Sequence, residues 1–122
     1  MQILIVTRRA EALSAFADAL AGGVGAELSF TDSWANTLAL ARDLPPAFAV
    51  LDEGLEGGGP LELAQRLIRV NAMINLAVVS ALPEAEFHEA AEGLGILSSV
   101  PPQPTQADGE ALAAVFRRFL PA

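Results

Sequence analysis

Short, mostly apolar runs alternate with amphipathic stretches five times along this chain of 122 residues. Most of these runs have the length and composition of buried strands, and the amphipathic stretches repeat their apolar residues with helical spacing. The run at 27–31 is mixed in polarity, which fits the edge of a sheet. The predicted strands are Gln2–Thr7, Glu27–Thr31, Ala47–Leu51, Asn75–Ser80 and Ile96–Val100.

Strands that alternate with helices form a parallel sheet covered on both faces. Because crossover connections are right-handed, five such units can be wound in only a few ways. We therefore predict an α/β fold with a doubly wound five-stranded parallel sheet in the order 2-1-3-4-5 and helices on both faces. Its ligand crevice would lie beyond the first and third strands, which end at Thr7-Arg8 and Asp52.

Capping residues and prolines predict where the helices begin. Ser33 can cap a helix over Trp34–Asp43, Pro60 and Pro83 can each begin one, and Asp108 or Gly109 can begin the last. The residues predicted to face the core are Leu13, Phe16, Ala17 and Leu20 in the first helix, Leu61, Ala64, Leu67 and Ile68 in the third, Phe87, Ala90, Ala91 and Leu94 in the fourth, and Leu112, Val115, Phe116 and Phe119 in the last.

The length of the chain suits one domain that spans residues 1–122. Hydrophobic residues make up 52% of the chain, which argues against disorder. No apolar stretch reaches the ~18 residues of a membrane span, and no signal peptide precedes the first strand, so we expect a cytoplasmic protein without membrane contact. The absence of cysteine excludes disulfides, thiol catalysis and thiolate metal sites.

The charged residues restrict the partners and the chemistry further. A net charge of -8 makes the domain a poor binder of phosphate backbones, so no direct nucleic-acid contact is expected. All seven basic residues are arginines, so any mechanism that needs a lysine ammonium is excluded within this chain. These arginines are Arg8, Arg9, Arg42, Arg66, Arg69, Arg117 and Arg118.

Three stretches carry a resemblance to a known family: AVLDEGLEGGGPLELAQRLI, AVVSA and AAEGLGILSSVP. In this order and spacing they resemble the receiver domain of bacterial response regulators, which take part in two-component phosphorelay signalling. The resemblance covers nearly all 122 residues. It implies a single receiver-like domain with the flavodoxin-like receiver fold.

Part of the family's phosphotransfer machinery is present. The resemblance implies that Asp52 is the phospho-acceptor and that Ser80 is the switch hydroxyl, followed by the small residue Ala81. Gly54 could offer the carbonyl that helps to hold Mg²⁺. From the residues alone, Asp52 could instead be an aspartate that caps a turn at the end of a strand.

The rest of the machinery is replaced. Thr7 and Arg8 stand where the family has the acidic pair that binds Mg²⁺, and an arginine repels a hard cation. Val100, before Pro101, stands where the family has a lysine, and Leu97 replaces an aromatic switch residue. We therefore expect Thr7, Arg8, Gly54 and Val100 to line a degenerate pocket that holds no metal or other cofactor. By resemblance, the Val100–Pro101 bond should be cis.

A degenerate receiver of this kind would act mainly through protein–protein contact and not as an enzyme, with weak or no Mg²⁺-dependent phosphorylation. The partner would be a histidine kinase, an effector domain or a second copy of the chain. It would dock on a face with Phe87, Leu94, Arg117 and Arg118 as candidate contacts. Two alternatives stay open: a functional phospho-accepting regulator that uses Asp52, and a flavodoxin-like domain that binds a small ligand.

Arg8 suggests one specific contact. Its guanidinium could cross the crevice and pair with Asp52 as a fixed cation in place of the metal, because bidentate arginine–carboxylate pairs are geometrically strong. The alternative is that Arg8 points to solvent.

Overall fold

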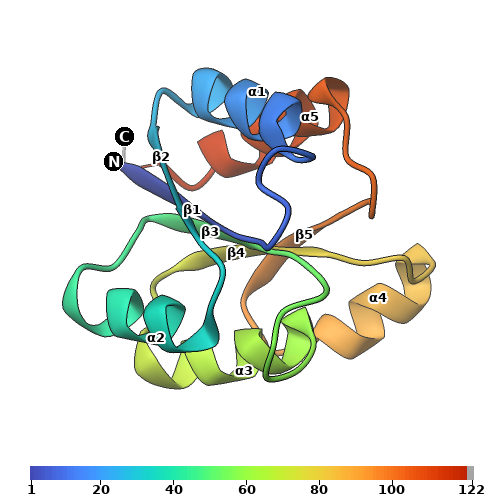
Figure 1. Ribbon diagram of the computed structural model, residues 1–122. Helices are drawn as coiled ribbons and strands as arrows, with labels where there is room; N and C mark the ends of the chain where they lie inside the picture. The colour runs from blue at the N-terminus through green and yellow to red at the C-terminus, as the bar shows by residue number, and fades with distance from the viewer. Residues whose placement is uncertain (121–122) are drawn as a thin grey trace.

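The computed structural model describes residues 1–120 and contains a five-stranded parallel sheet in the order β2-β1-β3-β4-β5 (Figure 1). This is the predicted doubly wound α/β fold. The strands are β1 (Gln2–Val6), β2 (Glu27–Thr31), β3 (Phe48–Leu51), β4 (Asn75–Val79) and β5 (Ile96–Val100). The helices are α1 (Ser14–Val24), α2 (Trp34–Asp43), α3 (Pro60–Val70), α4 (Glu84–Ala91) and α5 (Gln106–Arg117).

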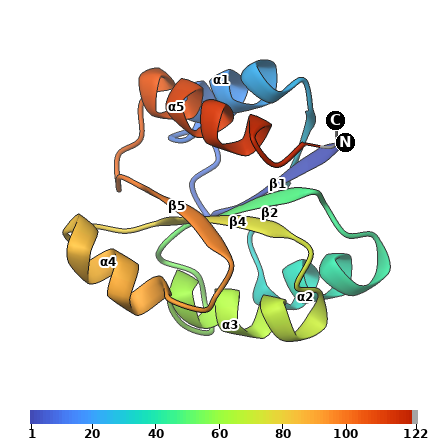
Figure 2. The same ribbon diagram turned by 180° about the vertical axis from the view of Figure 1, so that it is seen from behind.

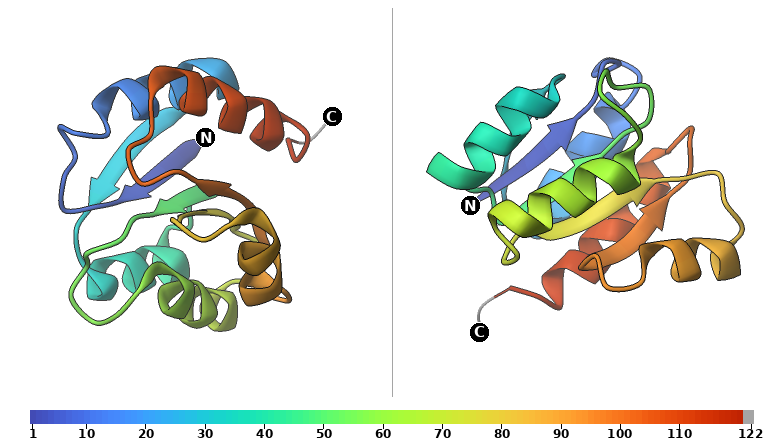
Figure 3. Two further views of the ribbon diagram at one scale, coloured as in Figure 1. Left: turned by 90° about the vertical axis from the view of Figure 1, so that its right-hand side faces the viewer. Right: turned by 90° about the horizontal axis from the view of Figure 1, so that it is seen from below.

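Helices cover both faces of the sheet, and each face has its own core. The helices α1 and α5 lie together on one face, and α2, α3 and α4 lie across the other (Figures 2 and 3). Because successive side chains of a strand point to opposite faces, β1 sends Ile3 and Ile5 into the first core and Leu4 and Val6 into the second. All four side chains are fully or almost fully buried.

The α1/α5 core contains a tight aromatic contact. The ring of Phe48 on β3 stacks on Phe116 of α5, with centroids 4.2 Å apart and planes 17° apart. Such a pair adds roughly 1 kcal/mol to the burial of its area. This contact fixes α5 against the middle of the sheet.

The register of the central strands places two side chains at one edge of the sheet. Val6 on β1 is paired with Leu51 on β3, and the Asp52 N–H donates to the Val6 carbonyl at 2.9 Å. The next residues, Thr7 and Asp52, therefore lie side by side at the carboxyl ends of the two strands, where doubly wound sheets hold their ligands.

The structure corrects several sequence-based expectations about the helices. Helix α5 begins at Gln106, because Thr105 and Asp108 form a capping box one turn before the predicted start. Phe119, predicted to face the core, lies beyond the helix and is 50% exposed, and Ala90 is exposed as well. In α3 the predicted Ala64 and Leu67 are buried, together with Leu63, whereas Leu61 and Ile68 are only partly buried.

The lengths of the helices bear on membrane contact. The longest described helix, α5, has 12 residues, and a bilayer-spanning helix needs about 20. No helix in residues 1–120 meets the length and apolarity of a membrane span.

Candidate functional site

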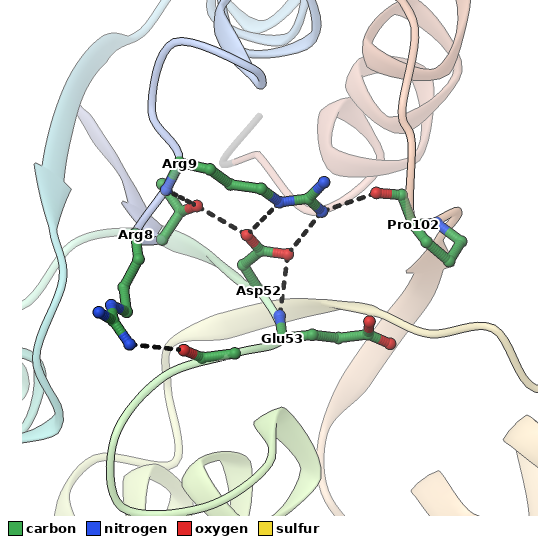
Figure 4. A network of polar contacts seen from close by, with 7 residues as sticks. Arg8, Arg9, Asp52, Glu53 and Pro102 are labelled. Atoms are coloured by element: carbon green, nitrogen blue, oxygen red, sulfur yellow. Dashed lines mark hydrogen bonds and ion pairs between the residues drawn. The ribbon is translucent and has the colours of Figure 1, made fainter.

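The Asp52 carboxylate lies at the predicted crevice and is completely enclosed by its own hydrogen bonds (Figure 4). Its Oδ2 accepts from the Thr7 hydroxyl at 2.7 Å and from Arg9 Nε at 2.9 Å. Its Oδ1 accepts from the Glu53 N–H at 2.8 Å and from Arg9 Nη2 at 2.9 Å. Each oxygen thus accepts from two donors, and the Asp52 side chain has no solvent-exposed surface.

Arg9, and not Arg8, supplies the cation of this site. The two Arg9 bonds to Asp52 form a bidentate fork, the strongest arrangement of a guanidinium and a carboxylate. The fork is aimed by a turn after β1, in which the Arg9 N–H donates to the Thr7 hydroxyl oxygen at 3.0 Å. The Arg9 side chain remains 31% exposed, so the ion pair is only partly desolvated.

The hypothesis that Arg8 pairs with Asp52 is wrong. Arg8 is exposed, and its Nη1 donates to the Gly54 carbonyl at 3.4 Å, a long bond, as Figure 4 shows. After β1 ends, the chain turns, so the strand rule of alternating side chains no longer predicts which of two adjacent arginines reaches the crevice.

Arg9 also connects the site to the loop between β5 and α5. Its Nη2 donates to the Pro102 carbonyl at 2.6 Å in addition to Asp52. One guanidinium thus holds together the loops that follow β1, β3 and β5 (Figure 4).

The surroundings keep Asp52 ionised. Burial is the largest single influence and by itself raises the pKa of Asp52. The hydrogen bonds from Arg9, Thr7 and the Glu53 N–H, together with the charge of Arg9, outweigh burial, and the pKa of Asp52 lies below its usual value. The same pairing raises the pKa of Arg9, so both groups carry full charge at neutral pH.

These residues do not suit Mg²⁺. A hard divalent cation needs several free oxygen ligands, but both Asp52 oxygens are occupied and a guanidinium lies within 2.9 Å of them. The nearby carboxylates of Glu53 and Glu56 are exposed. Within residues 1–120 no three acidic or histidine side chains converge as a metal site would require.

Among residues 1–120, the other residues predicted for the pocket form no hydrogen bond with the Asp52 side chain. The Ser80 hydroxyl accepts from the Leu82 N–H at 3.1 Å and caps the turn after β4. Gly54 has a φ of +78° and offers its carbonyl only to Arg8. Val100 is buried in the α1/α5 core. The Val100–Pro101 bond is trans, so the expectation of a cis bond is wrong.

The residues predicted for a partner face differ in their exposure. Phe87 is only 3% exposed, because its ring anchors α4 to the second core, so it is not the surface contact that we predicted. Leu94 is half-buried, and Arg118 is exposed. Arg117 is exposed but engaged, since its Nη1 donates to the Gly23 carbonyl of α1 at 2.7 Å.

Hollows on the surface do not meet at Asp52. Two adjoining hollows of about 430 and 400 Å³ lie on the other side of Arg8, against Asp32 at the start of α2. A hollow of about 650 Å³ lies at the opposite end of the sheet, between Met1, Leu44 and Met73. At Asp52, the position expected for a small ligand holds the Arg9 guanidinium, which bonds to Asp52 and to the Pro102 carbonyl.

Solved structures share this fold at low sequence identity. A two-component response regulator from Clostridium difficile has a TM-score of 0.78 and 14% identity, with 99% of each chain covered. The chain has the receiver fold. A CheY-like receiver domain protein from Methanospirillum hungatei JF-1 has a TM-score of 0.74 at 17% identity, with 96% of this chain and 91% of that chain covered.

A third similar structure with the receiver fold is the bacteriophytochrome response regulator RtBRR. Its TM-score is 0.75 at 20% identity, and the alignment covers 99% of this chain and 80% of that chain. No protein-family model matches the sequence. No curated protein matches it by sequence either. At these identities the comparisons establish the receiver fold, and the function has to be argued from the site.

Proposed function

We propose that this chain is a receiver-like module of two-component signalling that works through protein–protein contact and whose acceptor carboxylate is withdrawn from phosphotransfer. The observation that carries the proposal is the enclosure of Asp52, whose four hydrogen bonds come from Thr7, Arg9 and the Glu53 N–H. The partner would be a histidine kinase, an effector domain or a second copy of the chain.

Phosphorylation would require Asp52 to give up this arrangement. One carboxylate oxygen has to attack phosphorus in line, while the bond from phosphorus to the leaving oxygen breaks. Both oxygens are held by Arg9, and the carboxylate is fully buried, so attack requires at least one arm of the fork to open. Thr7 and Arg8 replace the acidic pair that would bind a metal ion, so no bound metal would neutralise the charge of the entering phosphoryl group.

Arg9 can take over the structural role of the metal ion and the lysine, which is to link the acceptor position to neighbouring loops. It joins the acceptor position to the loop after β5 through Pro102, as a fixed cation that needs no metal and no phosphoryl group. We infer that the domain keeps one signalling conformation and depends on its partner, not on phosphate, for regulation. It would be a cytoplasmic, non-enzymatic module without cofactor, nucleic-acid or membrane contact.

Acetyl phosphate and Mg²⁺ provide the direct test. If the reaction occurred, an Asp52 oxygen would form a bond to phosphorus, and acetate would leave with the electron pair of the broken phosphorus–oxygen bond. Intact-mass spectrometry should show no phosphorylated wild-type protein under conditions that fully label a receiver with the acidic pair. A labelled product that disappears in Asp52→Asn would establish the alternative, a functional phospho-accepting regulator.

A further inference from the structure

Charge is distributed very unevenly over this molecule. The chain has no arginine or lysine between positions 70 and 116, a stretch that contains α4, β5 and most of α5. The same stretch contributes six of the 15 acidic residues, which gives it a charge of -6 out of the total of -8. These acids are Glu84, Glu86, Glu89, Glu92, Asp108 and Glu110. The four on α4 and its end are exposed.

A hollow of about 410 Å³ lies between this acidic helix and β5. Its lining is mixed: Ala91, Ile96 and Leu97 contribute apolar side chains beside the buried ring of Phe87, and Ser98, Ser99 and His88, whose Nε2 lies 3.6 Å from Glu84 Oε1, contribute polar groups. Two carboxylates, Glu84 and Glu92, belong to its lining, whereas Glu86 and Glu89 do not. The hollow therefore combines three apolar side chains with two carboxylates, a chemistry that matches a side chain with an apolar stem and a cationic head.

The outer edge of β5 is open beside this hollow. In residues 1–120 β5 pairs only with β4, so it ends the sheet (Figure 2). The Val100 carbonyl faces β4, because it accepts from the Ser80 N–H at 2.9 Å. Ser99, one residue earlier, therefore turns its backbone groups outward. Its carbonyl accepts the Ser98 hydroxyl at 3.0 Å, and β5 contains no charged side chain to repel an added strand.

A second, smaller hollow lies on the other side of the same strand. It has about 120 Å³, and Ser98, Ser99 and Val100 line it together with Leu112 and Val115 of α5. A strand added to β5 would send alternate side chains toward α4 and toward α5. The two hollows are placed to receive them, and the larger one, with its carboxylates, faces α4.

We propose that the open edge of β5 binds an extended, basic segment of a partner protein by strand addition. Main-chain hydrogen bonds to Ser99 would supply pairing, and the stems of arginine or lysine side chains would lie against Ile96 and Leu97 with their charges at Glu84 and Glu92. This inference rests on the proposed function, because it names the chemistry of the partner that a contact-dependent module needs. It differs from that proposal in its site, which is remote from Asp52.

The test uses a synthetic hexapeptide that alternates arginine with valine, blocked at both ends, and a matched peptide with glutamate in place of arginine. Titration into the ¹⁵N-labelled protein should shift amides of α4 and β5, and the Ser99 N–H should exchange more slowly with solvent. Binding should weaken as salt is added, since the rim charges are exposed. The acidic peptide should not bind.

Matched variants separate the hollow from general negative charge. Glu84→Gln/Glu92→Gln should weaken binding by about fivefold, whereas Glu86→Gln/Glu89→Gln, with the same loss of charge on the same helix, should weaken it by less than about twofold. Ser99→Pro removes an outward N–H without touching the bonds to β4 and should abolish binding. If Ser99→Pro does not fold, the two glutamine pairs and the exchange of the Ser99 N–H carry the test.

Several results would overturn the proposal. These are an absence of binding at millimolar peptide, shifts that map outside α4 and β5, or equal effects of the two glutamine pairs. Concentration-dependent dimerisation that buries the β5 edge and excludes the peptide would assign this edge to a second copy of the chain. None of these outcomes bears on whether Asp52 is phosphorylated, so a failure of this inference can be distinguished from a failure of the proposed function.

Discussion

The guanidinium of Arg9 and the carboxylate of Asp52 are joined by two hydrogen bonds of 2.9 Å, although 43 positions separate the residues in the chain. The carboxylate is fully buried, so its ionised form depends on these donors. Removing one partner of such a pair leaves the other charge uncompensated, which costs more than the pair contributes when intact.

Arg9→Ala should therefore destabilise the domain by about 2 kcal/mol, less than for a fully buried pair because Arg9 is 31% exposed. Arg8→Ala is the matched control and should change the free energy of unfolding by less than about 0.5 kcal/mol, since Arg8 is exposed. Urea denaturation of the three proteins measures both values. Equal losses for the two variants would show that the fork contributes nothing specific.

The sequence predicts the fold well because the signal for each element is repeated five times. Short apolar runs between amphipathic helices permit few arrangements, and the observed order β2-β1-β3-β4-β5 is the expected one. The start of α5 was predicted too late, although Thr105 and Asp108 have the spacing of a capping box and could have indicated it. Phe119 was predicted to be buried because its spacing continues the helical pattern beyond the point where the helix ends.

The site could be predicted only in part. The end of an apolar strand located Asp52, and the first strand located Thr7, because both follow from the sheet. The choice between Arg8 and Arg9 depends on a turn in which the Arg9 N–H bonds to Thr7 Oγ1, and no periodicity encodes that turn. The link to Pro102 is a contact over 93 positions between two loops, which local patterns cannot reveal.

The pH dependence of stability should reveal the ionised state of Asp52. Its pKa is lowered in the folded protein, so its contribution is fully present above the unfolded value of about 3.9 and is lost as the pH falls through the lower folded value. The free energy of unfolding of the wild type should thus rise with pH near and below pH 4. The corresponding rise should be smaller in Asp52→Asn, which urea titrations at several pH values can measure.

The pKa of Asp52 should rise when Arg9 is removed. Burial is the largest influence on Asp52 and raises its pKa, and in Arg9→Ala only Thr7 and the Glu53 N–H remain to oppose it. The ¹³Cγ resonance of Asp52 should therefore titrate below the usual range in the wild type and at a higher pH in Arg9→Ala. An unchanged midpoint would mean that Arg9 does not control this group.

The Thr7 hydroxyl should contribute through its two bonds. It donates to Asp52 Oδ2 at 2.7 Å and accepts from the Arg9 N–H at 3.0 Å, and the residue is buried. Thr7→Val keeps the shape but removes both bonds, which should cost about 2 kcal/mol and raise the pKa of Asp52. Thr7→Ser keeps the hydroxyl and should retain the Asp52 titration of the wild type. An Asp52 pKa in Thr7→Val equal to that of the wild type would contradict this role.

The packing of α1 against α5 gives opposite expectations for two helical glycines. A Cβ at Gly109 on α5 would collide with the carbonyl oxygen of Phe16 and press on Ala19 of α1. In contrast, a Cβ at Gly22 on α1 would meet no atom within 4 Å. Alanine is favoured over glycine in a helix by about 1 kcal/mol, so Gly22→Ala should raise the free energy of unfolding by up to that amount.

For Gly109→Ala the same gain in helix propensity is opposed by overlap with backbone atoms, which cannot move without separating the two helices. We expect a net loss of about 2 kcal/mol and a lower thermal midpoint. Because both changes are from glycine to alanine within a helix, their difference isolates the contact between α1 and α5. Stabilisation by both substitutions would mean that the helices can separate freely, and that the close approach at Gly109 does not hold α5, with its Pro102 loop, in place.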